Sequence, residues 1–325
     1  TRRLVADLQS TAGVTVTAIA SRQEERARWY AEQYGIKVGT SSYADLLERD
    51  DVDAVYIALP PALHLEWAIA AAEAGKAVLC EKPVVTSLSD FLRLAEVCKQ
   101  KEQRWLDATG WLYHPRTAAI AERIEGGKIG QLRHVTTAVS FFEPFQTNDH
   151  RLNRSLGGGC LLDLGWYAVG LAVWSLGQPR QVYATAIERD GVLFRVTALL
   201  AFDQQWTATI NCGYDTSTRK WCEIAGDQGS IVCDDFTRPW PEKPARFWIH
   251  DRAGSVEQEQ FQGHQEKAMI ETFVGQDPLT VFHRQAMLTQ MTLDAIARSL
   301  SSGTAEPVVT GQRSSTDEGE APPCA

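Results

Sequence analysis

The sequence predicts a two-domain protein: an α/β domain with a doubly wound parallel sheet, followed by an α+β domain with an open antiparallel sheet. Three observations support this prediction. The chain has 325 residues, more than one hydrophobic core usually organises. Up to about residue 110, apolar runs of strand length alternate with segments of helical periodicity, which is typical of parallel sheets. After Pro115, strand-like segments follow one another directly, which indicates antiparallel pairing.

The first domain is expected over residues 1–110. Ser21, Ser42 and Ser87 are each followed three residues later by an acidic residue, and this spacing indicates the capped start of a helix. The expected helices cover residues 2–10, 21–34, 42–47, 63–75 and 87–101, and the expected strands cover 14–20, 37–39, 54–59, 77–80 and 104–109.

The centre of this domain is the segment 54–83. Two apolar runs, Ala54–Leu59 and Ala77–Cys80, each end close to a proline, and an alanine-rich stretch with helical periodicity lies between them. A strand, a helix and a second strand form a βαβ unit with parallel strands. Ligands of such sheets bind beyond the carboxyl ends of the strands. The turn Glu81–Pro83 is therefore expected at the ligand-binding edge.

The second domain is expected over residues 111–310, with a disordered tail over 311–325. Its helices are expected at 117–126, 164–176, 266–274 and 282–300, and its strands at 132–142, 182–187, 192–202, 206–212, 221–225, 230–233 and 246–249. A glycine-rich corner, Gly157–Gly159, leads into the second of these helices. The tail is rich in Ser, Thr, Gly, Pro and acidic residues, a composition typical of disorder.

The composition is that of a soluble globular protein, with 44% hydrophobic and 22% charged residues. A net charge of -9 argues against nucleic acid as a partner, because phosphate binding requires a basic surface. No apolar run approaches the roughly 20 residues of a membrane span, so no membrane partner is expected. Seven cysteines without regular spacing indicate reduced thiols and a cytoplasmic location. No zinc-site spacing occurs, so no metal is expected.

Six segments, in matching order and spacing, resemble the Gfo/Idh/MocA family of nicotinamide-dependent oxidoreductases. They cover residues 18–22, 51–64, 74–83, 113–116, 157–167 and 226–231. The resemblance extends to about residue 309 and is to the branch that contains glucose-fructose oxidoreductase and dihydrodiol dehydrogenase. It implies a Rossmann-type first domain, NADP or NAD as cofactor, and a homodimer or higher homo-oligomer formed through the antiparallel sheet. It also implies hydride transfer between nicotinamide and a carbinol or carbonyl carbon of a sugar, polyol, cyclitol or dihydrodiol.

The family opens with a strand and a Gly-x-Gly-x-x-Gly turn that holds the cofactor pyrophosphate. This chain begins inside the helix that follows that turn, and the glycines at 126–130 close a helix instead of opening one. The Rossmann-type domain is therefore expected to be N-terminally incomplete. Two alternatives to an active enzyme stay open: a non-catalytic sugar sensor or regulator on the same scaffold, and an inactive truncated form.

Lys82 is the first catalytic candidate. By resemblance it exchanges the proton of the substrate hydroxyl, and a lysine partly removed from water beside a cationic nicotinamide gives up its proton more readily than a free one. Glu81 is expected to orient this lysine or the nicotinamide ribose, and Pro83 to fix the turn. The alternative is a surface lysine in an ordinary turn.

Asp163 and Tyr167 are the other catalytic candidates. They are four residues apart and share one face of a helix. By resemblance, Asp163 holds a sugar hydroxyl and Tyr167 donates a proton. The alternatives are a helix-capping aspartate and a tyrosine packed in the core.

Ser21, Arg22 and Arg26 stand where an NAD-specific domain carries an acidic residue. A serine and two arginines can hold a 2′-phosphate instead, which favours NADP, although a helix cap and exposed arginines are the alternative. The further residues expected at the cofactor by resemblance are Leu59, Pro60, His64, Glu81, Lys82 and Pro83. An ordinary turn and a packed histidine are the alternative for the first three.

The substrate candidates beyond Lys82, Asp163 and Tyr167 are aromatic. Trp111 and Tyr113 lie in a segment where the family usually carries an arginine that Leu112 replaces here, so the family's substrate preferences transfer only in part. Trp166, with the phenylalanines at 141, 142 and 145, could form an aromatic wall for a sugar or arene-derived ring, although such residues are more often core. Cys80 is expected to be a buried strand residue.

Overall fold

The computed structural model describes residues 2–142, 145–146 and 148–309. It divides into two compact units. The first unit contains Thr1–Val85, Ser89–Ala108 and Glu266–Leu279, and the second contains Thr86–Leu88, Thr109–Gln265 and Thr280–Ala325. Each unit is described by itself. The tail expected at 311–325 lies outside the described residues.

Parallel strands form the centre of the first unit. Strands β3 (Ala54–Ile57), β4 (Ala77–Cys80) and β5 (Trp105–Asp107) make a three-stranded sheet, with Ile57 paired to Cys80 and Cys80 paired to Asp107. Strands β1 (Ala18–Ala20) and β2 (Val38–Thr40) form a separate parallel pair. The parallel sheet predicted for this part of the chain is therefore confirmed.

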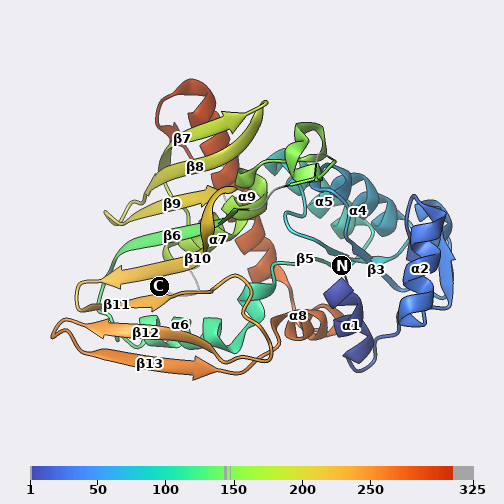
Figure 1. The fold of residues 1–325 in the computed structure, drawn as a ribbon, viewed down its shortest axis with the longest axis horizontal. Helices are drawn as coiled ribbons and strands as arrows, with labels where there is room; N and C mark the ends of the chain where they lie inside the picture. The colour runs from blue at the N-terminus through green and yellow to red at the C-terminus, as the bar shows by residue number, and fades with distance from the viewer. Residues whose placement is uncertain (1, 143–144, 147, 310–325) are drawn as a thin grey trace. The chain divides into compact units, whose positions relative to one another are not determined.

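Helices connect these strands as the alternating pattern predicts (Figure 1). The connecting helices are α2 (Glu24–Tyr34), α3 (Tyr43–Leu47), η1 (Pro61–Leu63), α4 (His64–Glu73) and α5 (Leu88–Gln100), whereas α1 (Arg2–Ser10) precedes β1 and α8 (Gln265–Val274) comes from late in the chain. The cap at Ser42 is confirmed, since its side chain accepts a hydrogen bond from the Asp45 N–H at 3.0 Å. The cap expected at Ser21 is wrong by two residues: Gln23 is the N-cap of α2, and the Ser21 hydroxyl accepts from the Gln23 N–H at 3.4 Å.

The second unit is built on a nine-stranded sheet. Its strands are β6 (Leu132–Phe142), β7 (Gln181–Arg189), β8 (Val192–Ala201), β9 (Thr207–Gly213), β10 (Asp215–Gly226), β11 (Gly229–Cys233), β12 (Ala245–Asp251), β13 (Val256–Phe261) and β14 (Glu306–Pro307). They lie side by side in the order β13-β12-β11-β10-β6-β9-β8-β7-β14 (Figure 1). The pairing is antiparallel except between β6 and β9, which run parallel, so the sheet is mixed. The sequence did not predict β13 or β14.

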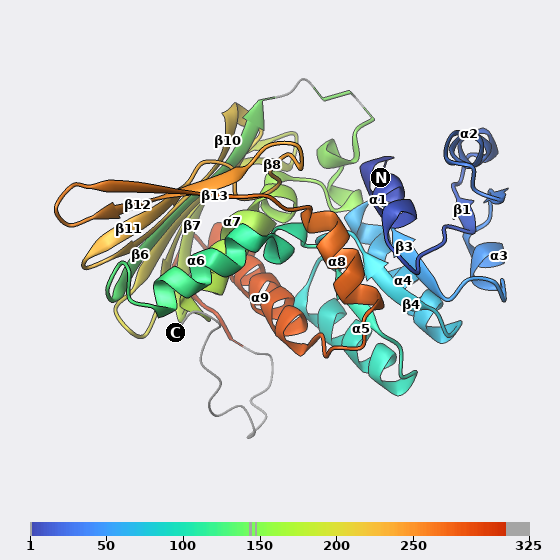
Figure 2. The ribbon, with the colours of Figure 1, turned by 90° about the horizontal axis from the view of Figure 1, so that it is seen from below.

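Helices cover one face of this sheet. They are α6 (Pro115–Glu125), α7 (Trp166–Leu176) and α9 (Thr280–Ser302) (Figure 2). Along β7 and β8 the residues alternate: Val182 and Leu200 are buried, whereas their neighbours Tyr183 and Leu199 are exposed on the other face. The open sheet predicted from the sequence is therefore present.

One segment of the described chain, Arg154–Leu176, is long and apolar enough to cross a membrane by length and composition, and the sequence-based expectation overlooked it. In the structure, 67% of its most apolar window is buried. The burial of α7 in the core of the second unit accounts for the apolar composition.

Candidate active site

The turn that carries Lys82 begins directly after β4 and is tied to both neighbouring strands. The Glu81 N–H donates to the Ile57 carbonyl of β3 at 2.9 Å. On the other side, the Val84 N–H donates to the Oδ2 atom of Asp107, at the end of β5, at 2.9 Å. The side chain of Lys82 is half-buried, and Pro83 and Val84 are buried. The lysine is thus presented from a backbone that is fixed on both sides, at the carboxyl edge of the sheet.

Glu81 is fixed through a second contact with β3. The Tyr56 hydroxyl donates a hydrogen bond to the Oε1 atom of Glu81. Tyr56 is one residue ahead of the end of β3, so strand pairing brings it beside the turn. This geometry favours an orienting role for Glu81 over a freely exposed carboxylate.

His64 lies at the start of α4 with 1% of its surface exposed. Its Nδ1 atom is 2.8 Å from the Pro83 carbonyl and its Nε2 atom is 2.7 Å from the Leu59 carbonyl. Burial lowers the pKa of this imidazole. Since both ring nitrogens face backbone carbonyls of the same unit, the position of His64 fits the alternative interpretation, a packed histidine. Leu59 and Pro60 are half-buried in the loop after β3.

The chemistry of the residues after β1 fits a phosphorylated dinucleotide. Ser21 follows the strand directly, and its N–H donates to the Thr40 carbonyl at 3.0 Å. The side chains of Arg22 and Arg26 are exposed. A hydroxyl and two guanidinium groups near one strand end can hold a 2′-phosphate. No carboxylate stands at Ser21 or Arg22, where one would favour NAD.

In the second unit, Asp163 receives two hydrogen bonds at the same oxygen. The Nε atom of Arg151 donates to Oδ2 at 2.9 Å, and the Tyr214 hydroxyl donates to it at 3.1 Å. Although burial of Arg151 opposes its charged form, the pair with Asp163 raises the pKa of this guanidinium. Burial, then the Asp163 charge, raises the pKa of the Tyr214 phenol, so Tyr214 acts as a neutral donor. Asp163 is thus held in one orientation from two sides.

Aromatic side chains pack around the ring of Tyr214. The ring of Tyr214 lies 4.9 Å from that of Phe145, 5.4 Å from Phe141 and 5.9 Å from Phe194, measured between centroids. Phe141 and Phe145, expected as a substrate wall, therefore support the tyrosine that contacts Asp163. Phe142 is 71% exposed.

The glycine corner explains how Arg151 reaches Asp163. The Gly159 N–H donates to the Arg151 carbonyl at 3.0 Å, and Gly157 and Gly159 have φ values of 80° and 112°, which favour glycine. The chain then enters η5 (Leu161–Gly165), a π-helical turn that carries Asp163 and was not predicted. Such turns are frequent at functional sites.

Tyr167 follows in α7, and among the residues of this fully described helix it is the one that is not buried. The helix-capping alternative for Asp163 does not hold, because Cys160 is the N-cap of η5. Asp163 and Tyr167 therefore both keep the exposure that contact with a substrate requires.

The two tryptophans expected at the substrate are packed in the second unit. Trp111 is 1% exposed, with ring centroids 5.8 Å from Trp174 and 5.9 Å from Phe236. Trp166 is also 1% exposed, and its Nε1 atom donates to the Thr109 hydroxyl at 2.8 Å. Their burial counts against direct contact with a substrate, and core packing accounts for both. Tyr113 is half-buried and stacks on Phe282 at 4.6 Å.

Cys80 is fully buried in β4, as the sequence predicts, and burial raises the pKa of its thiol.

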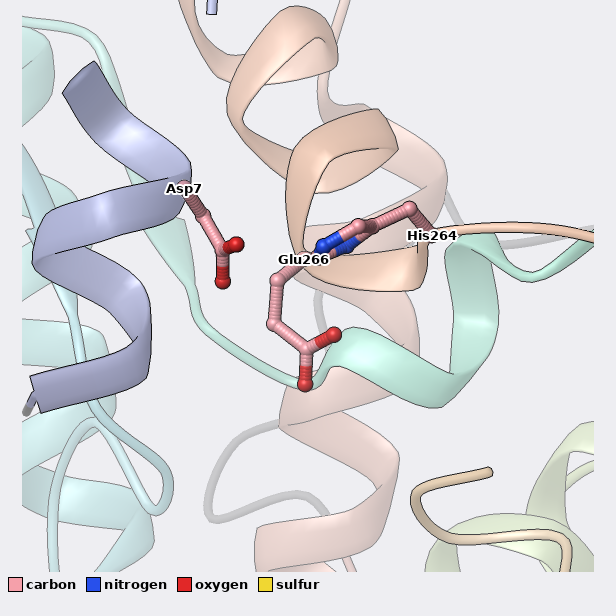
Figure 3. Close-up of side chains that lie close together, drawn as sticks. All are labelled: Asp7, His264 and Glu266. Atoms are coloured by element: carbon pink, nitrogen blue, oxygen red, sulfur yellow. The ribbon is translucent and has the colours of Figure 1, made fainter. Parts of the chain in front are cut away.

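A candidate group of metal-binding side chains lies away from the residues discussed above. Asp7 of α1 and Glu266 of α8, both in the first unit, bring one oxygen of each carboxylate within 4.8 Å of the other, and Figure 3 draws them with His264. His264 belongs to the second unit. Two carboxylates from one unit do not make a metal site, so we assign none.

Sequence reasoning missed four residues that support the candidates: Tyr56, Asp107, Arg151 and Tyr214. The sequence does point to two of them, because Tyr56 lies one residue before the end of β3 and Asp107 ends β5, on either side of the Lys82 turn. It does not point to the other two, since their approach to Asp163 depends on the path of the chain through the glycine corner.

Comparison with known proteins shows that two segments of the sequence match family models. Residues 1–107 match the family described as "Oxidoreductase family, NAD-binding Rossmann fold", and residues 117–232 match the "GFO/IDH/MocA C-terminal domain". D-xylose 1-dehydrogenase (NADP(+)) 2 from Haloferax volcanii is 33% identical over 89% of this chain and 90% of its own length. The dTDP-3,4-didehydro-2,6-dideoxy-alpha-D-glucose 3-reductase from Actinomadura kijaniata is 36% identical over 75% of this chain and 74% of its own length.

A solved structure extends the likeness to three dimensions. KijD10, a 3-ketoreductase from Actinomadura kijaniata in complex with NADP and TDP-benzene, matches with a TM-score of 0.86 and 31% identity. The match covers 92% of this chain and 94% of that one. Both units of the present structure therefore have counterparts in one solved chain.

Proposed function

The chain belongs to the Gfo/Idh/MocA family and is an NAD(P)-dependent oxidoreductase of sugar-type substrates, and from this premise we propose how its residues divide the reaction. The observation that carries the proposal is the fixed turn Glu81–Pro83 at the carboxyl end of β4, where ligands of parallel sheets bind. Residues 1–110 hold the dinucleotide and residues 111–310 hold the substrate.

Lys82 exchanges the proton of the reacting oxygen. When bound, the nicotinamide supplies or accepts the hydride. Oxidation of a carbinol releases one hydride and one proton, so a base must take the hydroxyl proton, and in reduction an acid must return it to the carbonyl oxygen. A half-buried primary amine on a fixed backbone can do both. Glu81, held by Tyr56, orients this amine.

Asp163 positions the substrate and Tyr167 is a second proton donor. A carboxylate accepts several hydrogen bonds, so Asp163 can hold a sugar hydroxyl while keeping its bonds to Arg151 and Tyr214. The partial exposure of Tyr167 in an otherwise buried helix supports its role. Tyr113 is the remaining candidate for substrate contact.

The test of this proposal is the variant Lys82→Ala, assayed with NADP and a panel of aldoses, polyols and inositols. We expect turnover to fall by at least about 100-fold, because proton transfer by a positioned group contributes that much, while NADPH binding persists. The matched control is Lys76→Ala, since Lys76 stands at the other end of β4 and donates to the Arg49 carbonyl at 2.8 Å. Unchanged turnover in the Lys82 variant would contradict the assignment.

The preferred cofactor is NADP, held at its 2′-phosphate by Ser21, Arg22 and Arg26. We expect Arg22→Ala to weaken NADPH binding about tenfold or more, as loss of one charge-assisted bond does, and to leave NADH binding unchanged. Arg28→Ala is the control, because Arg28 is exposed on α2 and lies farther along the chain from the end of β1. An equal effect of both variants, or on both cofactors, would contradict the preference.

The exposed sheet face forms the contact of a homodimer or higher homo-oligomer. Tyr183 and Leu199 are paired across β7 and β8 and are 46% and 47% exposed, with Ile187 on the same face. An apolar patch of this kind needs a cover. Sedimentation should show dissociation of Leu199→Arg, whereas Leu92→Arg, at a 50% exposed site on α5, should sediment as the parent. A cytoplasmic location is consistent with six free cysteines among the described residues.

A further inference from the structure

Two loops meet at the imidazole of His64. One follows β3 and contains Leu59 and Pro60, and the other follows β4 and contains Lys82 and Pro83. The ring approaches the carbonyl of Leu59 at 2.7 Å and that of Pro83 at 2.8 Å, one with each nitrogen. With 1% of its surface exposed, the ring is shielded from water, so both contacts are internal to the first unit.

From this geometry we infer that His64 is a positioning residue, which clamps the loop after β3 to the lysine-bearing turn and so sets where the Lys82 amine stands. The inference rests on the proposed role of Lys82. It differs from the role that the family resemblance suggested for His64, which was contact with the cofactor. Both ring nitrogens already face protein carbonyls, and a buried ring has no third polar atom to offer to a ribose or a nicotinamide.

The clamp acts on the residue next to the catalytic candidate. Pro83 has no N–H, so its carbonyl is the one backbone hydrogen-bonding group by which the turn can be held at that position. Val84 is held separately by Asp107 at 2.9 Å, and Glu81 by the Ile57 carbonyl at 2.9 Å. His64 thus supplies the third tie, and its removal leaves Lys82 between one fixed and one loosened neighbour.

The protonation state of His64 decides how many of its bonds form. Carbonyl oxygens only accept, so a neutral ring with one N–H donates to Leu59 or to Pro83, and the imidazolium donates to both. Burial and, more weakly, the charge of Lys82 disfavour the imidazolium, whereas the two carbonyls and Glu81 favour it. Burial is the largest of these influences, and the pKa of His64 is lowered. A neutral ring therefore ties the turn only in the tautomer whose Nδ1–H donates to the Pro83 carbonyl, and this is the tautomer that the inference requires, since His64 itself ends the loop after β3.

The experiment compares His64→Phe and His64→Gln with the parent chain and with Leu94→Ala. Phenylalanine keeps the ring volume but donates nothing, whereas the glutamine amide can still donate to a carbonyl. Leu94 is fully buried on α5 of the same unit, so its truncation destabilises that unit without touching the turn. Turnover is measured with the best substrate of the panel, and NADPH affinity by tryptophan fluorescence.

We expect kcat of His64→Phe to fall by about 10- to 100-fold, because a misplaced catalytic group costs that much, with NADPH affinity within about twofold of the parent. His64→Gln should recover part of the loss, and Leu94→Ala should keep the parent kcat below its melting temperature. If NADPH affinity falls and kcat does not, His64 contacts the cofactor and the clamp is wrong. Equal kcat values in all variants would also contradict the clamp.

A measurement on the parent chain keeps the inference testable if His64→Phe does not fold. With histidine labelled by nitrogen-15, a ring N–H held in a buried hydrogen bond exchanges slowly with water and gives its own resonance, assigned by its absence in His64→Gln. Rapid exchange of that proton would overturn the clamp. If Lys82→Ala is inactive and His64→Phe is normal, the clamp alone fails; if Lys82→Ala is active, the proposed function fails with it.

Discussion

The carboxylate of Asp107 accepts a hydrogen bond at 2.9 Å from the backbone N–H of Val84, two residues after Lys82. Asp107 is the last residue of β5 and is 5% exposed. A carboxylate buried at the end of one strand thus orders the backbone that leaves the neighbouring strand. The turn that carries Lys82 thus contacts three adjacent elements, β3, β5 and α4, and substitutions on β5 and α4 test whether these contacts set the position of the lysine.

The first prediction concerns Asp107→Ala. The Val84 N–H is then buried without its acceptor, which costs about 1–3 kcal/mol of unfolding free energy. We also expect kcat to fall while NADPH affinity is retained, since the turn loses one of its ties. Urea unfolding and steady-state kinetics measure the two effects. Asp107→Asn keeps an oxygen acceptor and should lose less of both, and equal losses in the two variants would contradict this account.

The second prediction concerns Arg151→Met. The substitution keeps an unbranched chain but removes the charge-assisted bond to Asp163, while the bond from the Tyr214 hydroxyl is kept. Bonds to charged groups are worth about 1.5–3 kcal/mol. We therefore expect kcat/KM for the sugar substrate to fall about 10- to 100-fold.

Arg246→Met is the matched control for that variant. Arg246 pairs with Asp234 in the same unit at 2.8 Å, and both side chains are exposed, so this surface pair contributes little. Its kcat/KM should stay within about twofold of the parent. Equal kinetics of the two methionine variants would show that Arg151 does not position Asp163.

Strand prediction succeeded where burial dictates the residue pattern. Strand β6 was predicted with its observed bounds, because Leu132–Phe142 is β-branched or apolar at most positions and packs between two neighbours. Strand β13 was missed because its sequence, VEQEQF, is mostly polar. It is an edge strand whose Glu257 and Glu259 pair with Lys128 and Arg123. Its polarity reflects contact with water and with those cations, which a hydrophobic pattern cannot reveal.

The two parts of the candidate site also differed in how far the sequence could predict them. The Lys82 turn could be predicted because its place follows from local rules: a buried strand, a proline and a parallel neighbour. The partners of Asp163 could not, since Arg151 and Tyr214 are brought to it by the glycine corner and by strand β9 running into β10. Tertiary path, not local propensity, decides those contacts.

The third prediction concerns pH and His114. The Nδ1 atom of His114 accepts from the Arg116 N–H at 3.0 Å at the start of α6, and burial, then the Arg116 charge, lowers the pKa of this imidazole to about 4. An unfolded histidine titrates near 6.5. Between these values the unfolded chain binds the proton first, so His114 stabilises the fold above about pH 6.5 and this contribution is lost as pH falls toward 4, at most about 3 kcal/mol.

His114→Asn isolates this contribution. Asparagine is a good N-cap and does not titrate, so the helix start is kept. Urea unfolding at intervals from pH 4 to pH 7 should give a shallower dependence of unfolding free energy on pH for the variant than for the parent. Parallel pH curves would show that His114 does not carry the shift.

The last prediction concerns Gly158, at the middle of the corner that brings Arg151 to Asp163. A Cβ atom at this position would lie 2.5 Å from the His150 carbonyl oxygen, 2.6 Å from that of Arg151 and 2.7 Å from that of Asn153. All three are backbone atoms, so no side chain can move aside. Gly158→Ala must therefore displace the 150–153 backbone, and Arg151 moves with it. Because Arg151 holds Asp163, we expect KM for the sugar substrate to rise about tenfold or more while NADPH binding in the first unit is unchanged.

Gly254→Ala is the control, since Gly254 has a φ of +86° with nothing within 4 Å of its Cβ position. It carries backbone strain alone, far along the chain in the β12–β13 turn. If Gly254→Ala raises KM as much as Gly158→Ala does, strain rather than the displaced arginine is responsible, and the corner does not position Asp163.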